Sequence, residues 1–285
     1  MGECFLDWWR EHGSGYRAVL LDIDGTLKTG RRALPNAVRT LAWLREHDFP
    51  FRLLTNDGNN SPRQKCRALA RAGLEVAEAE IVSCGMALAK YAADPKWRGR
   101  RFYVVGDLGD PSYADTAGLR TARDARALDD CAAIVVGEGD YDWRIELSAA
   151  LNALLRDPGK RLIVPNPDSY WPNGADGEIG IGAGGKARFL LSILREAGVV
   201  LEPDYLGKPY PPIFQLALAS LRESAADQEW SGEPVLMLGD SLKSDIVGAN
   251  RHGLTSGLVL TGITNRKMAD AATGDERPDW VFDTL

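Results

Sequence analysis

A short apolar run that leads directly into two carboxylates is the feature that most constrains this chain. Residues 18–21 read Ala-Val-Leu-Leu, and they continue without a break into Asp22-Ile23-Asp24-Gly25-Thr26. The run predicts a buried strand over residues 17–21, and side chains two residues apart at a strand end point to the same side. Two carboxylates held so close repel each other, so they need a cation or a shared proton. Open α/β sheets place their chemistry at such strand tips.

The composition is that of a globular protein and argues against several classes of partner. Of 285 residues, 45% are hydrophobic and 26% are charged, and the net charge is −6. Because no basic tract stands out, we expect no nucleic acid partner, although a local site can still bind phosphate. The sequence shows neither a signal peptide nor an apolar stretch that could span a membrane, so we expect no membrane partner. Four scattered cysteines without a CxxC pair indicate neither a zinc site nor a disulfide framework, which favours a cytoplasmic protein with reduced thiols.

Strand and helix patterns alternate along the chain. Apolar strand patterns lie at residues 49–54, 81–83, 161–164, 235–238, 257–260 and 280–282. Helical spacing of apolar residues separates them, for example over residues 35–47 and 186–197. The alternation predicts an α/β fold built on a parallel sheet.

An internal echo lies in the middle of the chain. The sequence Val104-Val105-Gly106-Asp107 recurs 31 residues later as Val135-Val136-Gly137-Glu138. That interval suits a strand–helix–strand unit. Two interpretations of the echo remain open: ordinary turn chemistry at two strand ends, or two acidic loops that face a shared cleft.

Polar side chains of complementary chemistry follow several of the expected strands. They are Asp22 and Asp24, Thr55 and Asn56, Lys208, and Asp240 and Asp245. In a parallel sheet these strand tips meet at one edge, where the carboxylates would suit Mg²⁺, a cation that prefers hard oxygen ligands. A hydroxyl, an amide and an amine would suit the oxygens of a phosphate. A carboxylate that is free to attack phosphorus would become an acyl phosphate.

Four motifs in this chain resemble, in order and spacing, those of the haloacid dehalogenase-like phosphatases. They are Asp22-Ile23-Asp24-Gly25-Thr26-Leu27, Thr55-Asn56, Gly207-Lys208-Pro209 and Gly239-Asp240-Ser241-Leu242-Lys243-Ser244-Asp245. The long insert between the second and third motifs resembles the class IIA branch, which carries an α/β cap there. Within the insert, Asn166-Pro167-Asp168, Pro172 and the glycines before Lys186 are similar to the 4-nitrophenylphosphatases, ribonucleotide monophosphatases and phosphoglycolate phosphatases.

The resemblance implies a division into two domains. Residues 1–84 and 184–285 would form a Rossmann-like catalytic core, and residues 85–183 an inserted α/β cap that determines substrate specificity. The glycine run at residues 180–185 matches a dinucleotide-binding pattern, but no apolar strand precedes it, so we expect no dinucleotide there. We interpret this run as the hinge between cap and core.

The resemblance also implies a reaction, the Mg²⁺-dependent hydrolysis of a phosphate monoester. Asp22 would attack phosphorus and form an aspartyl-phosphate, while Asp24 would serve as general acid and then as general base. The metal ligands would be Asp22, the backbone carbonyl of Asp24, and Asp240. Thr55, Asn56 and Lys208 would bind the phosphoryl oxygens. Asp245 would orient Lys208 or a metal-bound water, and Gly25 would permit the sharp turn after the nucleophile.

Several positions allow two interpretations. Asp168 either faces the cleft from the cap or belongs to an ordinary turn. Asp57, beside the second motif, either repels strongly anionic substrates or points away. The adjacent Trp8 and Trp9 either cover the sheet edge or form a surface for self-association, and a homodimer is compatible with the sequence. Four aromatic residues of the insert either stack on a flat substrate or pack in the core: Tyr141, Trp143, Tyr170 and Trp171.

The expected substrate is a small phosphorylated metabolite. Nucleotides, sugar phosphates, phosphoglycolate and pyridoxal phosphate all fit the resemblance. One rival is a phosphotransferase that passes the phosphoryl group to an acceptor other than water. The other is a receiver-type phospho-acceptor module, which Asp24 disfavours because an acid/base group at that position would discharge the intermediate.

Overall fold

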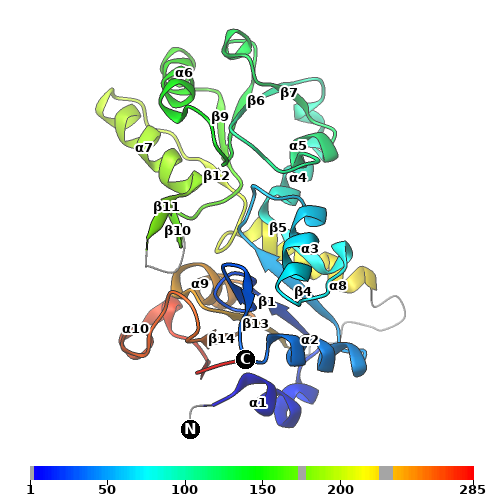
Figure 1. Ribbon diagram of the computed structural model, residues 1–285. Helices are drawn as coiled ribbons and strands as arrows, with labels where there is room; N and C mark the ends of the chain where they lie inside the picture. Colours follow the sequence, from blue (N-terminus) through cyan, green and yellow to red (C-terminus); the bar gives the residue numbers. More distant parts are fainter. Residues whose placement is uncertain (1–2, 173–177, 225–233) are drawn as a thin grey trace. The chain divides into compact units, whose positions relative to one another are not determined.

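The computed structural model describes residues 3–172, 178–224 and 234–285 (Figure 1). The chain divides into two compact units. The first unit comprises Met1–Thr55, Lys65–Val82 and Lys208–Leu285, and the second comprises Asn56–Gln64 and Ser83–Gly207. Every helix in the described ranges is too short or too polar to cross a membrane.

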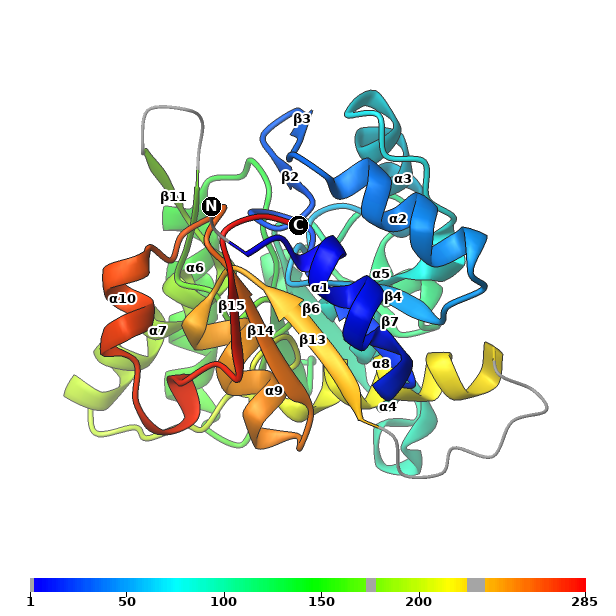
Figure 2. The same cartoon turned by 90° about the horizontal axis from the view of Figure 1, so that it is seen from below.

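A six-stranded sheet forms the centre of the first unit (Figure 2). Its strands follow the order β15-β14-β13-β1-β4-β5, with the bounds β1 Ala18–Leu21, β4 Phe51–Thr55, β5 Ile81–Ser83, β13 Val235–Gly239, β14 Thr255–Val259 and β15 Trp280–Phe282. Strand β1 pairs in parallel with both β13 and β4, so its carboxyl end lies between theirs. The predicted Rossmann-like parallel sheet is confirmed.

Helices and short turns connect these strands. The α-helices are α1 Phe5–His12, α2 Ala37–Glu46, α3 Pro62–Arg71, α8 Pro211–Ser224, α9 Val247–Arg251 and α10 Arg266–Ala271. The shorter helices are η1 Gly13–Gly15, η2 Glu78–Glu80, the π-helical turn η6 Leu242–Ile246, and η7 Gly274–Glu276. A small hairpin of β2 (Lys28–Thr29) and β3 (Arg32–Ala33) follows directly after the first motif.

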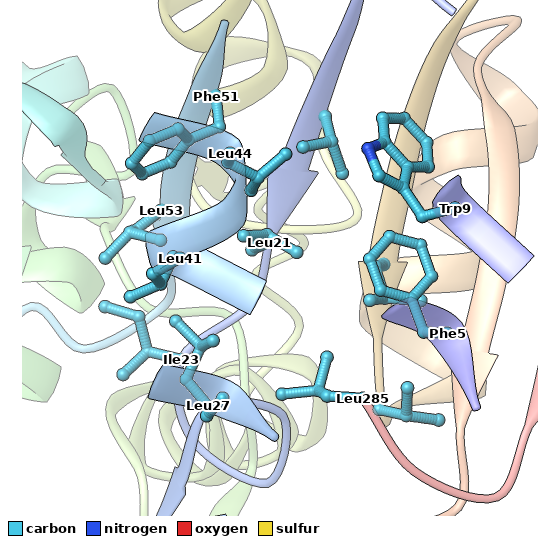
Figure 3. Packing of buried hydrophobic residues seen from close by; sticks show 14 of the residues in the cluster. Phe5, Trp9, Leu21, Ile23, Leu27, Leu41, Leu44, Phe51, Leu53 and Leu285 are labelled. Carbon is cyan, nitrogen blue, oxygen red and sulfur yellow. The ribbon is translucent and has the colours of Figure 1, made fainter. Parts of the chain in front are cut away.

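The core of the first unit includes the two adjacent tryptophans. Figure 3 shows Phe5, Trp9 and Leu21 among the buried apolar side chains of this cluster. Trp9 is fully buried, and its ring lies 5.4 Å from that of Phe5 and 5.0 Å from that of Phe49. Trp8 is buried as well. Helix α1 therefore covers the sheet with these rings, and they do not form an exposed surface for self-association.

The second unit contains a five-stranded sheet in the order β12-β9-β8-β6-β7. Its strands are β6 Arg101–Val105, β7 Arg120–Ala122, β8 Ala133–Val136, β9 Arg161–Val164 and β12 Asp204–Tyr205, and a separate hairpin consists of β10 Tyr170–Pro172 and β11 Ile179–Ile181. The α-helices are α4 Ala89–Ala93, α5 Tyr113–Thr116, α6 Trp143–Arg156 and α7 Ala183–Glu196. The 3-10 helices are η3 Cys84–Leu88, η4 Pro95–Trp97 and η5 Ala125–Ala127.

The internal echo corresponds to two neighbouring parallel strands. Strands β6 and β8 pair directly, with Val104 opposite Val135. The loops that follow them are bonded to each other, because the Asp107 amide donates to the Glu138 carbonyl at 2.7 Å and the Glu138 amide donates back at 3.0 Å. The echo thus produces a backbone bridge between two acidic loops.

The second unit extends further along the chain than the sequence suggested. Ala187, Leu190 and Leu194 of helix α7 are fully buried in its apolar cluster, so the unit continues to Gly207 rather than ending near residue 183. The glycine run at 180–185 spans β11 and the first turn of α7 inside this unit, so the hinge interpretation is wrong. Residues 173–177, which lie just before the boundary expected at residue 183, are outside the described residues.

Candidate active site

Asp22 stands at the tip of the central strand of the six-stranded sheet. Its amide donates to the Leu238 carbonyl at 2.9 Å, which continues the ladder between β1 and β13 by one residue. The parallel register of Leu21 with Leu238 places the tip of β13, and with it Asp240, at the same edge. The four residues of β1 before it are apolar and buried, and Asp22 itself is only 6% exposed. The strand therefore carries a carboxylate into the protein interior.

Lys208 connects two of the predicted carboxylates. Its ammonium group lies 2.5 Å from Asp22 Oδ1 and 2.7 Å from Asp245 Oδ1. It also donates to the Leu54 carbonyl at 3.1 Å. Three acceptors match the three donors of an ammonium group, and this satisfaction allows the lysine to be buried with only 2% exposure.

Three carboxylates form one buried cluster. Asp22, Asp240 and Asp245 each offer an oxygen within 4.8 Å of the others. Asp240 Oδ2 accepts from the Ile263 amide at 2.7 Å, and Asp245 Oδ2 from the Ser241 amide at 3.0 Å. The Asp22 Oδ2 atom is buried and has no hydrogen-bond partner among the described residues. A buried, unsatisfied carboxylate oxygen in an all-oxygen cluster fits a hard divalent cation.

The electrostatics of the cluster reflect burial and mutual repulsion. Burial raises the pKa of Asp22 to about 7 against the opposing effect of Lys208, and Asp245 raises it further. The pKa of Asp240 is raised well above its usual range, first by burial and then by the charge of Asp22. Burial lowers the pKa of Lys208, but the two neighbouring carboxylates outweigh burial and raise it overall. Without a cation, the ionised form of the cluster is therefore destabilised by burial and by repulsion between its carboxylates.

Asp24 lies beside the cluster but not in it. Its side chain is 54% exposed and forms an ion pair with Lys28 at the start of the small hairpin. The Gly25 amide donates to the Lys28 carbonyl at 2.8 Å, which closes the turn. Sequence reasoning missed Lys28, because a lone lysine in a short loop carries no pattern.

Glycines allow the loops to approach the carboxylates closely. Gly25 has a φ of 91°, and a Cβ atom there would lie 2.2 Å from Asp240 Oδ2. A Cβ at Gly262 would lie 1.8 Å from the same oxygen. Thr261 Oγ1 donates to the Gly25 carbonyl at 2.6 Å, so the loop after β14 closes this side of the site. This loop was also missed, although it follows an expected strand and could have been found as a further strand tip.

Thr55 and Asn56 follow β4, the other neighbour of β1. Thr55 is buried and ends the strand. Asn56 is the first residue of the second unit, and its Nδ2 donates to Asp168 Oδ2 at 3.0 Å. Asp168 therefore contacts a residue of the second motif, while its own amide donates to Asn166 Oδ1 in a turn.

Asp57 directs its carboxylate to its own loop. Oδ1 accepts from the amides of Asn59 and Asn60 at 2.8 and 3.1 Å, and Oδ2 accepts from Asn60 Nδ2 at 3.0 Å. These bonds form an Asx-type turn. Both carboxylate oxygens are thus bonded within their own loop, which favours the interpretation that Asp57 points away.

The four aromatic residues of the insert that could stack on a substrate do not belong to the buried core. Trp143, Tyr170 and Trp171 are exposed. Tyr141 is half-buried, and the Lys186 ammonium lies 4.5 Å from the centre of its ring.

Two family models match this chain. A family model described as haloacid dehalogenase-like hydrolase matches residues 19–120, and a second one, described as HAD-hydrolase-like, matches residues 205–285. The chain belongs to the haloacid dehalogenase-like hydrolases. Both matched segments include predicted motifs, so the resemblance seen in the sequence is confirmed.

Relatives of this haloacid dehalogenase-like hydrolase extend over nearly its whole length. The acid sugar phosphatase of Staphylococcus haemolyticus is 27% identical over 95% of this chain and 94% of its own. The ribonucleotide monophosphatase of Escherichia coli K12 is 28% identical over 94% and 96%. These names agree with the predicted branch and with the predicted enzyme class, a phosphoric monoester hydrolase.

Solved structures share the fold. A possible sugar phosphatase from Cytophaga hutchinsonii has a TM-score of 0.82 and 27% identity over 97% of this chain and 96% of its own. A glycerol phosphate phosphatase from Mycobacterium tuberculosis, solved in complex with magnesium, has a TM-score of 0.78 and 26% identity over 99% and 77%. The likeness covers both units of the present chain.

Proposed function

We propose that this protein hydrolyses a small phosphate monoester, with Mg²⁺ as cofactor and an aspartyl-phosphate on Asp22 as intermediate. The observation that supports it most strongly is the surroundings of Asp22. One carboxylate oxygen is bonded to Lys208, and the other is buried and has no hydrogen-bond partner among the described residues. An acidic side chain that is buried and incompletely satisfied next to two further carboxylates is expensive to maintain, and such groups concentrate at active sites.

In this mechanism Asp22 and Asp24 act in turn. A carboxylate oxygen of Asp22 attacks phosphorus, the new O–P bond forms, and the bond to the leaving oxygen breaks. Asp24 gives its proton to that oxygen, then removes a proton from the water that attacks the intermediate and releases inorganic phosphate. The exposure of Asp24 suits this role, because its side chain can turn from Lys28 to the leaving group.

The remaining residues would bind the phosphoryl group and hold the metal ion. Mg²⁺, held by Asp22, Asp240 and the Asp24 carbonyl, would supply positive charge that offsets the repulsion between Asp22 and the anionic substrate. Lys208 would contact a phosphoryl oxygen, and its 2.7 Å bond to Asp245 would fix its direction. Thr55 and Asn56 would donate to the other oxygens, where charge accumulates in the transition state.

The names of the relatives support a substrate class. Their names include an acid sugar phosphatase, a ribonucleotide monophosphatase, a dihydroxyacetone phosphatase and a D-glycerol 3-phosphate phosphatase. We propose a small phosphorylated metabolite for the present chain as well, with the second unit in the role of the specificity cap. Phosphate release should be screened over nucleotides, sugar phosphates, phosphoglycolate and pyridoxal phosphate.

Trapping the intermediate tests the proposal. The protein turns over 4-nitrophenyl phosphate with Mg²⁺, is denatured in acid within the first turnovers, and is digested for mass spectrometry. We expect a phosphoryl adduct on the peptide that contains Asp22, Mg²⁺-dependent phosphate release, and neither in Asp22→Asn. An active Asp22→Asn variant would refute the assignment of Asp22 as the nucleophile.

The same assay separates the two rivals. Added alcohols or nucleosides would yield a phosphorylated acceptor if the protein is a phosphotransferase. A phosphoprotein that persists without phosphate release would indicate a receiver-type module.

A further inference from the structure

The side chain of Asn56 is held in one orientation within the second unit. Its nitrogen donates to Asp168 Oδ2 at 3.0 Å, whereas its oxygen lies over Gly207, where a Cβ atom would come within 2.4 Å of it. A carboxylate accepts hydrogen bonds and repels a carbonyl oxygen, so the flipped amide is excluded. Asp168 thereby fixes the direction in which the Asn56 side-chain nitrogen points.

Asp168 is itself held by hydrogen bonds to other residues of the second unit. Its amide donates to Asn166 Oδ1 at 2.9 Å. Asn166 is buried, and its Nδ2 donates to Glu138 Oε1 at 2.6 Å. The same glutamate oxygen accepts from the Ala183 amide, at 3.3 Å, in the first turn of α7. Asp168 thus belongs to a continuous hydrogen-bond chain that runs from Asn56 to a helix of 14 residues.

The glycines at the start of α7 hold the Asp168 segment by close packing. A Cβ at Gly182 would lie 2.4 Å from the Asp168 carbonyl oxygen, and one at Gly184 would lie 2.0 Å from that of Pro167. A Cβ at Gly185 would lie 2.3 Å from the Ser169 carbonyl oxygen. Only glycine allows the helix to approach this backbone so closely. The glycine run therefore lets α7 pack directly against the loop that carries Asp168.

From this arrangement we propose that Asp168 is a positioning residue for the phosphoryl-binding amide of Asn56. The proposal rests on the function proposed above. A donor that is already oriented before substrate binds needs no rearrangement as negative charge develops on phosphorus. Asp168 would therefore promote phosphoryl binding through Asn56 without contacting the substrate.

A double-mutant cycle tests the coupling. We expect Asp168→Ala to lower kcat/KM for 4-nitrophenyl phosphate by about tenfold, because Asn56 loses a charge-assisted hydrogen bond. In an Asn56→Ala background the same replacement should change kcat/KM by less than about twofold. Asp168→Asn, which keeps an acceptor oxygen, should restore most of the activity. Asp129→Ala removes an exposed carboxylate paired with Arg156 in the same unit and is the matched control.

Binding of inorganic phosphate provides a readout without turnover. With Mg²⁺ present, calorimetry should show about tenfold weaker phosphate binding for Asp168→Ala and no further loss in the double variant. Equal losses in both backgrounds, or no loss in either, would overturn the proposal. If Asp168→Ala does not fold, Asp168→Ser, too short to reach Asn56 but compatible with the turn, replaces it in the cycle. A parent protein that binds phosphate but does not hydrolyse the ester would refute the proposed function alone.

Discussion

The two oxygens of Asp22 have different surroundings. Lys208 contacts one of them at 2.5 Å, and the other has no hydrogen-bond partner among the described residues. An ion pair fixes the carboxylate in one rotamer, so the second oxygen keeps a constant direction. Asp24 is held less firmly, since its side chain is exposed and its ion-pair partner, Lys28, lies on the same turn. These surroundings match a fixed nucleophile and a proton carrier that must move.

Replacing Asp24 separates its role from that of Lys28. We expect Asp24→Asn to slow phosphate release by about 10²–10⁴-fold, the usual loss when an acid/base group is removed. Lys28→Met should have a much smaller effect, because it removes the ion-pair partner and leaves the acid/base group. Steady-state rates with 4-nitrophenyl phosphate measure both variants. An Asp24→Asn enzyme at the parent rate would show the assignment to be wrong.

Helix α1 shows how an element before the first motif contributes to the fold. Its rings pack on the sheet, where Phe5 meets Phe282 of the last strand at 5.4 Å. The Phe5 amide also donates to the Thr284 carbonyl at 2.9 Å. The helix therefore ties the end of the chain to the core of the first unit.

Shortening the most buried ring of this helix should be costly. Trp9→Ala should lower the free energy of unfolding by about 3–5 kcal/mol, since it leaves a large cavity in the core. Urea unfolding followed by circular dichroism measures the loss. Trp143→Ala, which removes a tryptophan that is 48% exposed, serves as the control and should change little. Equal effects of the two replacements would contradict the packing described for α1.

Parallel strand topology explains which parts of the site could be predicted from the sequence. Asp22 and Asp240 could be found because each follows an apolar strand, and the carboxyl ends of parallel strands meet at one edge of a sheet. Lys208 does not follow this rule, since the strand before it, β12, belongs to the sheet of the second unit. The pairing of Lys28 with Asp24 and the approach of Gly262 to Asp240 depend on loop conformation, which has no periodic signal. The extent of the second unit was misjudged because an amphipathic helix such as α7 does not reveal which unit its apolar face covers.

At the scale of the whole molecule, folding gathers like charges from distant parts of the chain. Asp22, Asp240 and Asp245 lie more than two hundred residues apart at the extremes, yet their oxygens come within 4.8 Å. Asp22 binds a proton more tightly in the folded state, with a pKa of about 7, than at its ordinary value of 3.8. Over that interval the folded protein holds more protons than the unfolded chain, so stability falls as pH rises.

Metal-free protein should therefore lose stability between pH 5 and 8, by on the order of 2 kcal/mol. Calorimetric melting in the presence of a chelator measures the change. Asp22→Asn should reduce this pH dependence, and Mg²⁺ should raise the Tm of the parent protein most at pH 8, since it binds the folded state. A Tm that rises steadily through this pH range in the chelated protein would contradict the repulsion argued for the cluster.

The crowding of acids around one lysine has a practical corollary for protein engineers. Selecting heat-resistant variants without an activity screen should favour amide replacements at Asp22 or Asp240, because each would relieve electrostatic strain in the apo form. The most thermostable variants from such a selection would then lack catalytic activity.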